Sequence, residues 1–265
     1  MAIRMPAEHG AWGMLMVPFL SAAAVAGAWN VPVLLCGALA LGLFVLRGSA
    51  DQQGGWRALR QPEHWVMALA LAAVAGVLVL YYGRTQLLGV AAVGGILYVI
   101  QEMQVRIHNE ARTEKRSLAA ELIGVVLLSL AAPAAWIAAR GRLEPEGAQV
   151  WALNVLFFLG GVLYVKYRVR GLLAHREFSG WRERLAFAWP VFFYHVLLLA
   201  FLAASIFLRE LSAMVLLAFV PGILRASGLV FQLGQKFPIR RLGWMEVAHS
   251  VVFAALLVMA YRISQ

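Results

Sequence analysis

Residues 186–208 read AFAWPVFFYHVLLLAFLAASIFL, an apolar stretch without a single Asp, Glu, Lys or Arg. A helix of this length extends over about 34 Å, enough to cross the ~30 Å hydrocarbon core of a bilayer. The whole chain has the same character: 62% of its 265 residues are hydrophobic and 14% are charged, with a mean hydropathy of +0.77. Soluble domains carry about a quarter charged residues. The sequence therefore predicts an all-α polytopic membrane bundle and excludes a water-soluble globule.

Similar apolar runs, bounded by charged residues, Gly or Pro, recur along the chain. They predict about nine transmembrane helices in one integral membrane domain (residues 1–265), at approximately 12–29, 31–46, 65–82, 86–101, 118–138, 149–166, 186–208, 212–233 and 243–261. A cleaved signal peptide is the alternative interpretation of the first run, because that run ends in the small residues 22–28. The single cysteine, Cys36, excludes an intramolecular disulfide framework.

The positions of Lys and Arg predict the orientation of the chain. Of the 23 basic residues, 17 fall at the N-terminus or in the even-numbered connections between runs. Because basic residues near span ends are retained in the cytoplasm, we expect the N-terminus on the cytoplasmic side and the C-terminus outside. The net charge of +10 is explained by this topology and by attraction to anionic lipid. No basic region stands clear of the predicted spans, which argues against nucleic acid as a partner.

The stretch before the first run contains Glu8 and His9 together with Trp12. Glu8 and His9 are candidate catalytic residues, because a carboxylate beside an imidazole can transfer protons. The alternative is an interfacial anchor, in which Trp12 lies at headgroup level and its polar neighbours are simply solvated. The same choice between function and structure arises at Glu121, a candidate catalytic residue inside the fifth run, where a carboxylate is costly unless it is paired or protonated.

Basic residues gather at the end of the sixth run. Lys166 and Arg170 are four residues apart and share a helix face, whereas Arg168 points about 160° away. Lys166 and Arg170 are therefore candidate ligands for a phosphate or carboxylate. They are equally explained as snorkelling cations at the membrane boundary.

Arg225 lies within the eighth run, about 12 Å from its inner end at helical rise. A buried arginine in a membrane should face a partner, a ligand or a water-filled cavity. Glu246 and Glu121 are the candidate partners, and His249 lies three residues after Glu246 on the same helix face. We consider Arg225 and His249 substrate-binding candidates and Glu246 a catalytic candidate.

His195 lies in the seventh run, the one histidine away from the predicted inner face. An interhelical hydrogen bond explains it better than a ligand role does.

Three motifs together resemble the YwiC-like family of bacterial membrane proteins. They are the opening Pro6-Ala7-Glu8-His9-Gly10-Ala11-Trp12-Gly13, the Arg116…Glu121…Gly124 stretch, and Leu242-Gly243-Trp244-Met245-Glu246. The resemblance covers nearly the whole chain, and its specific part is the Glu-His-Gly-Ala-Trp element. It implies a location in the cytoplasmic (inner) membrane of a bacterium, but no activity.

A weaker, architectural resemblance is to the UbiA-type intramembrane prenyltransferases. Nine spans with polar connections after the second, fourth and sixth look like that arrangement, and Lys115-Arg116 before an apolar span with Pro133 is similar to the same region. The resemblance implies substrate binding by Arg116 and by the stretch from Arg47 to Asp51. It also implies magnesium held by Asp-rich motifs, but here residues 47–53 contain only Asp51, and 166–170 are basic. Acid has been replaced by base, which puts a magnesium-diphosphate mechanism in doubt.

Two functions follow from these patterns. The first is an intramembrane transferase-like enzyme acting on a prenyl or phosphorylated lipid, with Arg and Lys holding the anion. The second is a non-enzymatic assembly partner or a carrier of a small anion. Both place membrane lipids around the chain, and the sequence identifies neither a cofactor nor a bound metal.

Overall fold

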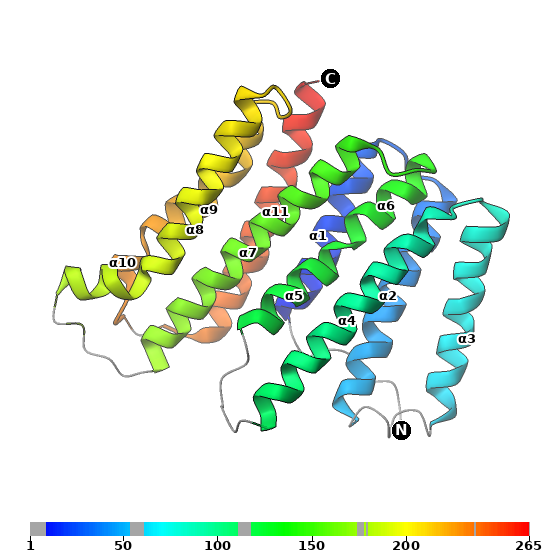
Figure 1. Ribbon diagram of the computed structural model, residues 1–265, viewed down its shortest axis with the longest axis horizontal. Helices are drawn as coiled ribbons and strands as arrows, with labels where there is room; N and C mark the ends of the chain where they lie inside the picture. The colour runs from blue at the N-terminus through cyan, green and yellow to red at the C-terminus, as the bar shows by residue number, and fades with distance from the viewer. Residues whose placement is uncertain are drawn as a thin grey trace. The chain divides into compact units, whose positions relative to one another are not determined.

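The computed structural model describes residues 9–53, 61–110, 118–173, 178, 180–235 and 237–264. Helices account for nearly all of them, and no strand occurs among the described residues. The elements, labelled in Figure 1, are α1 His9–Ala26, α2 Val31–Gln52, α3 Pro62–Gly76, the π-helix η2 Val77–Tyr81, α4 Gln86–Glu110, α5 Leu118–Ser129, α6 Ala131–Arg140, α7 Pro145–Leu173, α8 Trp181–Phe207, α9 Val215–Ser227, α10 Leu229–Gln232 and α11 Ile239–Ile263.

The helices coincide with the predicted runs. Over the described residues, seven helical segments are long and apolar enough to cross a membrane, and two shorter apolar helices, Gly10–Ala26 and Val215–Ser227, accompany them. Each of the nine predicted runs overlaps one of these segments. The prediction of an all-α polytopic bundle is therefore confirmed, whereas the orientation of the termini stays a prediction.

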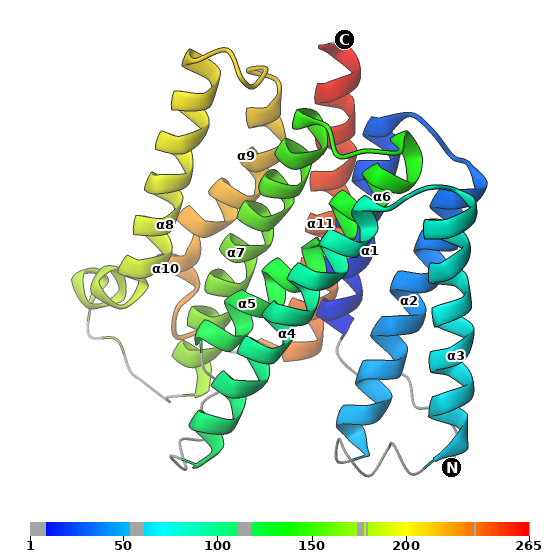
Figure 2. The same cartoon turned by 45° about the vertical axis from the view of Figure 1, so that its right-hand side comes forward.

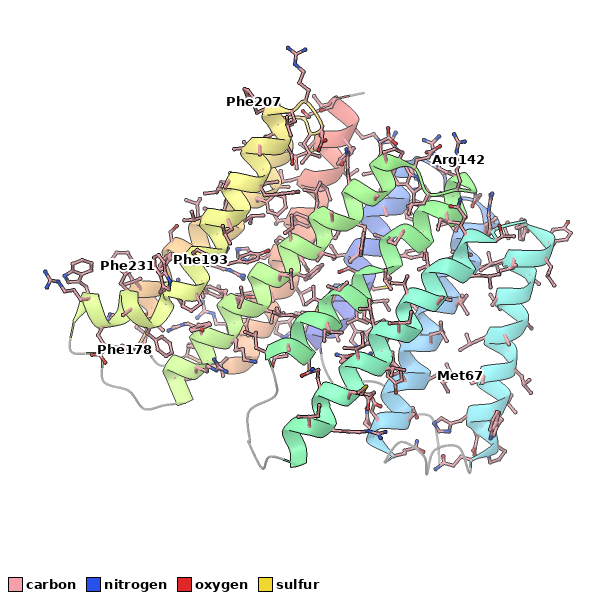
Figure 3. All side chains as sticks on the ribbon, viewed as in Figure 1. Met67, Arg142, Phe178, Phe193, Phe207 and Phe231 are labelled. Carbon is pink, nitrogen blue, oxygen red and sulfur yellow. The ribbon has the colours of Figure 1, made fainter. Side chains whose placement is uncertain are left out.

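Large apolar side chains cover the outside of the helices. Phe193 and Phe207 of α8 are 49% and 86% exposed, and Phe231 of α10 is 75% exposed. Figure 3 shows these side chains as sticks on their helices. Soluble proteins rarely leave so much apolar surface uncovered, so contact with lipid is the physical explanation.

The chain forms two compact units, residues 1–151 and 152–265, with α7 contributing to both. In the first unit α1 packs on α6 and α5, while α2 packs on α3 and α6. Figure 2 shows α2 and α3 side by side. The α1–α6 contact is made of small residues, with Ala22, Ala23, Ala132 and Ala135 all fully buried. Small side chains let membrane helices approach closely, which is how this unit packs without a hydrophobic driving force. A single integral domain over residues 1–265 stays a prediction.

The fifth predicted run forms two helices. α5 ends at Ser129 and α6 begins at Ala131, because Pro133 has no backbone N–H to donate to the carbonyl of Ser129. Gly141 ends α6 in the left-handed conformation, with φ of 92°, as glycine commonly does at a helix C-terminus.

In the second unit α9 packs against α11 and α8. Phe253 of α11 is 1% exposed and stacks on Phe157 of α7, with ring centroids 4.0 Å apart. Phe219 of α9 meets Phe253 edge-on at 5.3 Å. This aromatic cluster joins α7, α9 and α11.

We expect replacement of Asn30 by alanine to lower the free energy of unfolding by about 1–2 kcal/mol. The Asn30 side chain accepts from the backbone N–H of Val33 at 3.1 Å, which caps α2, and donates to the carbonyl of Ala139 at 3.2 Å. Asn30→Ser keeps a capping oxygen but does not reach Ala139, so its loss should be intermediate. Unfolding in mixed micelles titrated with sodium dodecyl sulfate measures both, and equal stability of the two variants would contradict the interhelical bond.

Candidate functional site

Arg225 lies in the last turn of α9 and forms an ion pair with Glu246 of α11. Its Nη1 group donates to the Oε1 atom of Glu246. The Arg225 side chain is 10% exposed and that of Glu246 is 22% exposed. Of the two carboxylates that the sequence left open as partners, Glu246 is therefore the one that pairs with Arg225. Because α9 ends at Ser227, Arg225 lies at a helix end and not deep within a continuous helix as the sequence suggested.

The aromatic ring of Tyr164 in α7 packs against the Arg225 guanidinium of this ion pair. The guanidinium carbon of Arg225 lies 4.1 Å from the centre of the Tyr164 ring, a cation–π contact. The Tyr164 hydroxyl donates to Oε1 of Gln232 in α10 at 2.7 Å. A Cβ atom at Gly161 would lie 3.5 Å from Oε2 of Glu246, so the glycine brings α7 into contact with the carboxylate. Residues of α7, α9, α10 and α11 thus hold Arg225 in place.

Arg168, one turn after Tyr164 on α7, adds a second buried cation. Only 6% of the residue is exposed, and its guanidinium carbon lies 4.3 Å from the centre of the Phe237 ring. Among the described residues Arg168 makes no ion pair or hydrogen bond through its guanidinium. The face of the guanidinium rests on an aromatic ring, while its N–H edge remains available to an acceptor. Two guanidinium groups and one carboxylate therefore surround Tyr164.

A small cavity lies beside this cluster, between α7, α8 and α9. Its walls include Gly160 and Tyr164 of α7, His195 of α8, and Gly222 and Arg225 of α9. His195 is 9% exposed, and its Nδ1 atom lies 2.7 Å from the carbonyl oxygen of Val191 in the same helix. The expected interhelical hydrogen bond is therefore an intrahelical one.

Of the other residues predicted at this end, Arg170 and His249 contact groups of their own helices. Lys166 and Arg170 are half-buried on α7, and the Arg170 guanidinium lies 5.8 Å from the ring of Tyr167 on its own helix. His249 places its Nδ1 atom 3.0 Å from the carbonyl of Met245, also within its own helix. The buried cation of this helix end is Arg168, and the roles of Lys166, Arg170 and His249 in binding stay predictions.

In the first unit a separate polar group surrounds Arg47 of α2. Its Nη2 group donates to Oε1 of Gln101 at 2.7 Å, and its Nε lies 3.7 Å from Oδ2 of Asp51. The guanidinium carbon is 4.8 Å from the centre of the Tyr98 ring. Gln101 in turn donates to the carbonyl of Ala120 at 3.0 Å, which joins α4 to α5. Arg47 and Asp51 are thus brought together, as parts of a network that connects three helices.

These residues do not fit the magnesium site that the prenyltransferase resemblance implies. A hard cation takes several oxygen ligands, usually carboxylates. Asp51 is already engaged by Arg47, and the helix end at 166–170 carries cations, including the buried Arg168. No group of three or more His, Cys, Asp or Glu placed to hold a metal ion occurs in the described part of the chain.

The remaining candidates are placed only in part. Glu121 lies half-buried in the first turn of α5, in the first unit. His9 begins α1. Glu8 and Arg116 lie outside the described residues. Their predicted roles stay predictions.

Sequence reasoning missed Tyr164 and Arg168 as site residues. The available signal was their spacing from Gly161: positions three and seven residues after it fall on the same helix face. On this face, Gly161 permits close packing of a neighbouring helix, and Arg168 is a buried charge.

Comparisons with known proteins point to one family. The sequence model of the YwiC-like protein family matches residues 5–136, about half of the chain. The chain is 27% identical over 254 residues to the uncharacterized protein YwiC of Bacillus subtilis (strain 168), covering 95% of both chains. It is also 28% identical over 156 residues to an uncharacterized protein of Haemophilus influenzae, covering 59% of this chain and 58% of that protein. No solved structure matches, and the UbiA-type arrangement stays a prediction.

Proposed function

This chain belongs to the YwiC-like family, and from that premise we propose that it is an intramembrane transferase-like protein that binds the phosphorylated headgroup of a prenyl lipid or phospholipid. The binding site is the cluster of Arg168, Tyr164, Arg225 and Glu246 in the second unit. The relatives are uncharacterized proteins, so the proposal rests on the site.

The excess of buried positive charge carries the proposal. Glu246 neutralises Arg225, but the described residues offer Arg168 no carboxylate. A buried guanidinium without a carboxylate is costly in a membrane protein, so it calls for a compensating anion or water. A phosphate group supplies such a charge and accepts several N–H groups from the guanidinium edge.

A lipid is the natural source of that phosphate. Arg168 lies near the C-terminal end of α7, Arg225 in the last turn of α9, and Glu246 in the first half of α11. These helix ends are cytoplasmic in the predicted topology, where headgroups of the inner leaflet are found. The surrounding helix surfaces are apolar and exposed, which suits the chains attached to such a headgroup.

Transfer chemistry follows from the same cations. When a bond to a phosphate breaks, negative charge grows on its oxygens, and fixed guanidinium groups stabilise that charge. Glu246, engaged with Arg225, orients this guanidinium. Guanidinium groups can stabilise this charge without an Asp-rich motif.

Native mass spectrometry of the protein in mild detergent tests the proposal. We expect wild-type protein to retain a phosphate-bearing lipid, which extraction then identifies. Arg168→Gln should lose at least tenfold of this occupancy, because the change removes the unpaired cation and leaves the Arg225–Glu246 pair intact. Arg182→Gln is the matched control, since Arg182 is an exposed cation at the start of α8.

Three results would count against the site. They are an empty wild-type protein, retention of uncharged lipid alone, and equal loss of lipid in Arg168→Gln and Arg182→Gln.

A further inference from the structure

The cavity between α7, α8 and α9 is small enough for its size to decide its occupant. The space open to the centre of a water molecule is about 20 Å³. About 10–15 Å³ of such space is enough for one water. A phosphate group, with four oxygens around phosphorus, is too large for this space. The cavity therefore does not hold the headgroup phosphate that we propose for Arg168.

Hydrogen-bond chemistry fixes the form of His195 on the cavity wall. Its Nδ1 atom faces the carbonyl oxygen of Val191, which can only accept, so Nδ1 carries the hydrogen. The Nε2 atom of neutral His195 therefore presents a lone pair. A Cβ atom at Gly160 would lie 3.5 Å from this Nε2, and no described residue donates a hydrogen bond to it.

Arg225 supplies donors to the same cavity. Its Nη1 group is used by Glu246, and its Nε group is buried without a partner. Among the described residues the guanidinium makes no other hydrogen bond. Arg225 and His195 are each about nine-tenths buried, and both the donors of Arg225 and the ring of His195 border one small, partly open cavity. Buried waters typically satisfy such groups, and they need two or more polar partners.

We propose that the cavity binds one water molecule that donates a hydrogen bond to Nε2 of His195 and accepts one from the Arg225 guanidinium. His195 is then a proton acceptor inside the membrane, connected through one water to the cation of the headgroup site. The same position suits the hydroxyl group of an acceptor molecule, which makes the same two hydrogen bonds. The water site stands on the cavity alone, while its use in a transfer reaction rests on the proposed function.

Solid-state NMR of ¹⁵N-histidine-labelled protein in phosphatidylcholine bilayers tests this site without any substrate. The His195 signals are assigned by their absence from His195→Gln. In the wild type we expect a protonated Nδ1, an unprotonated Nε2, and magnetisation transfer from water to the His195 ring that exceeds the transfer in Gly160→Ala several-fold.

Gly160→Ala is the displacing variant, since its Cβ would enter the space beside Nε2 and press on Tyr194 at 3.1 Å. It should abolish the water transfer. Gly243→Ala is the control, because a Cβ there meets nothing within 4 Å and Gly243 lies away from the cavity. Its water transfer should equal that of the wild type.

A dry His195 in the wild type would overturn the inference, whichever way Gly160→Ala behaves. So would a ring protonated at Nε2 alone. These readouts do not involve lipid: an unoccupied headgroup site with a hydrated His195 sinks the proposed function only, and a lipid-bound protein with a dry cavity sinks only the water site.

Discussion

Replacement of Glu246 by leucine is expected to lower the free energy of unfolding by about 3–5 kcal/mol, because it leaves a buried charge without its partner. The Arg225 side chain is 10% exposed and has no other carboxylate among the described residues. Leucine fills a volume similar to that of glutamate, so the loss reports the charge and not a cavity. Titration with sodium dodecyl sulfate in mixed micelles, followed by circular dichroism, measures it.

The double variant Arg225→Met with Glu246→Leu distinguishes the effect of an unpaired charge from the effect of altered packing. Removing both charges leaves no uncompensated ion, so we expect its stability to return to within about 1 kcal/mol of the wild type or to exceed it. The exposed pair of Arg142 and Glu144, 3.3 Å apart with 75% and 27% exposed side chains, is the control. Glu144→Leu should change stability by less than about 1 kcal/mol.

Equal losses in Glu246→Leu and Glu144→Leu would show that burial does not strengthen the Arg225–Glu246 pair. A double variant as unstable as Glu246→Leu would assign the loss to packing, and the charge argument would fail.

Membrane helices were predictable because the apolar run that crosses a bilayer is also the run that forms the helix. Each predicted run overlaps an apolar helix. Interruptions were harder to predict. Pro133 breaks the fifth run at Leu130, and the eighth run divides into α9 and α10 at Gly228, although Pro18 and Pro190 lie within continuous helices. Neighbouring helices decide which proline a membrane helix tolerates, and a sequence does not show its neighbours.

Site residues were predictable where a charged side chain stands within an apolar run, because burying such a charge in a membrane is unfavourable. Arg225 stands out in an apolar run, and Glu246 is a carboxylate near a helix start at the same predicted side. Arg168 does not stand out among six basic residues between positions 166 and 184. What separates it from Lys166 and Arg170 is the Phe237 ring over its guanidinium, a contact with a residue far along the chain.

Arg168→Met is expected to stabilise the lipid-free protein by about 1 kcal/mol or more, the opposite of what an ordinary core substitution does. Arg168 is 6% exposed and lacks a carboxylate partner among the described residues, so folding buries its charge against the Phe237 ring without a counter-ion. Methionine keeps the flexible apolar stem that rests beside Phe237 and removes the guanidinium. Arg182→Met, which removes an exposed cation at the start of α8, should leave stability within about 0.5 kcal/mol of the wild type.

Without lipid we expect Arg168→Met to be more stable than the wild type, and added phosphorylated lipid should make the wild type the more stable of the two. A ligand at 100 times its dissociation constant stabilises the folded state by about 2.7 kcal/mol. We expect phosphatidic acid or geranylgeranyl phosphate in the micelles to raise the unfolding free energy of the wild type and of Arg182→Met, but not of Arg168→Met, while diacylglycerol raises none of them. The unpaired arginine then lowers the stability of the empty protein and accounts for the affinity of the occupied one, a relation common at binding sites. If Arg168→Met destabilises the lipid-free protein, the guanidinium is already compensated without an anion, and the headgroup site is refuted.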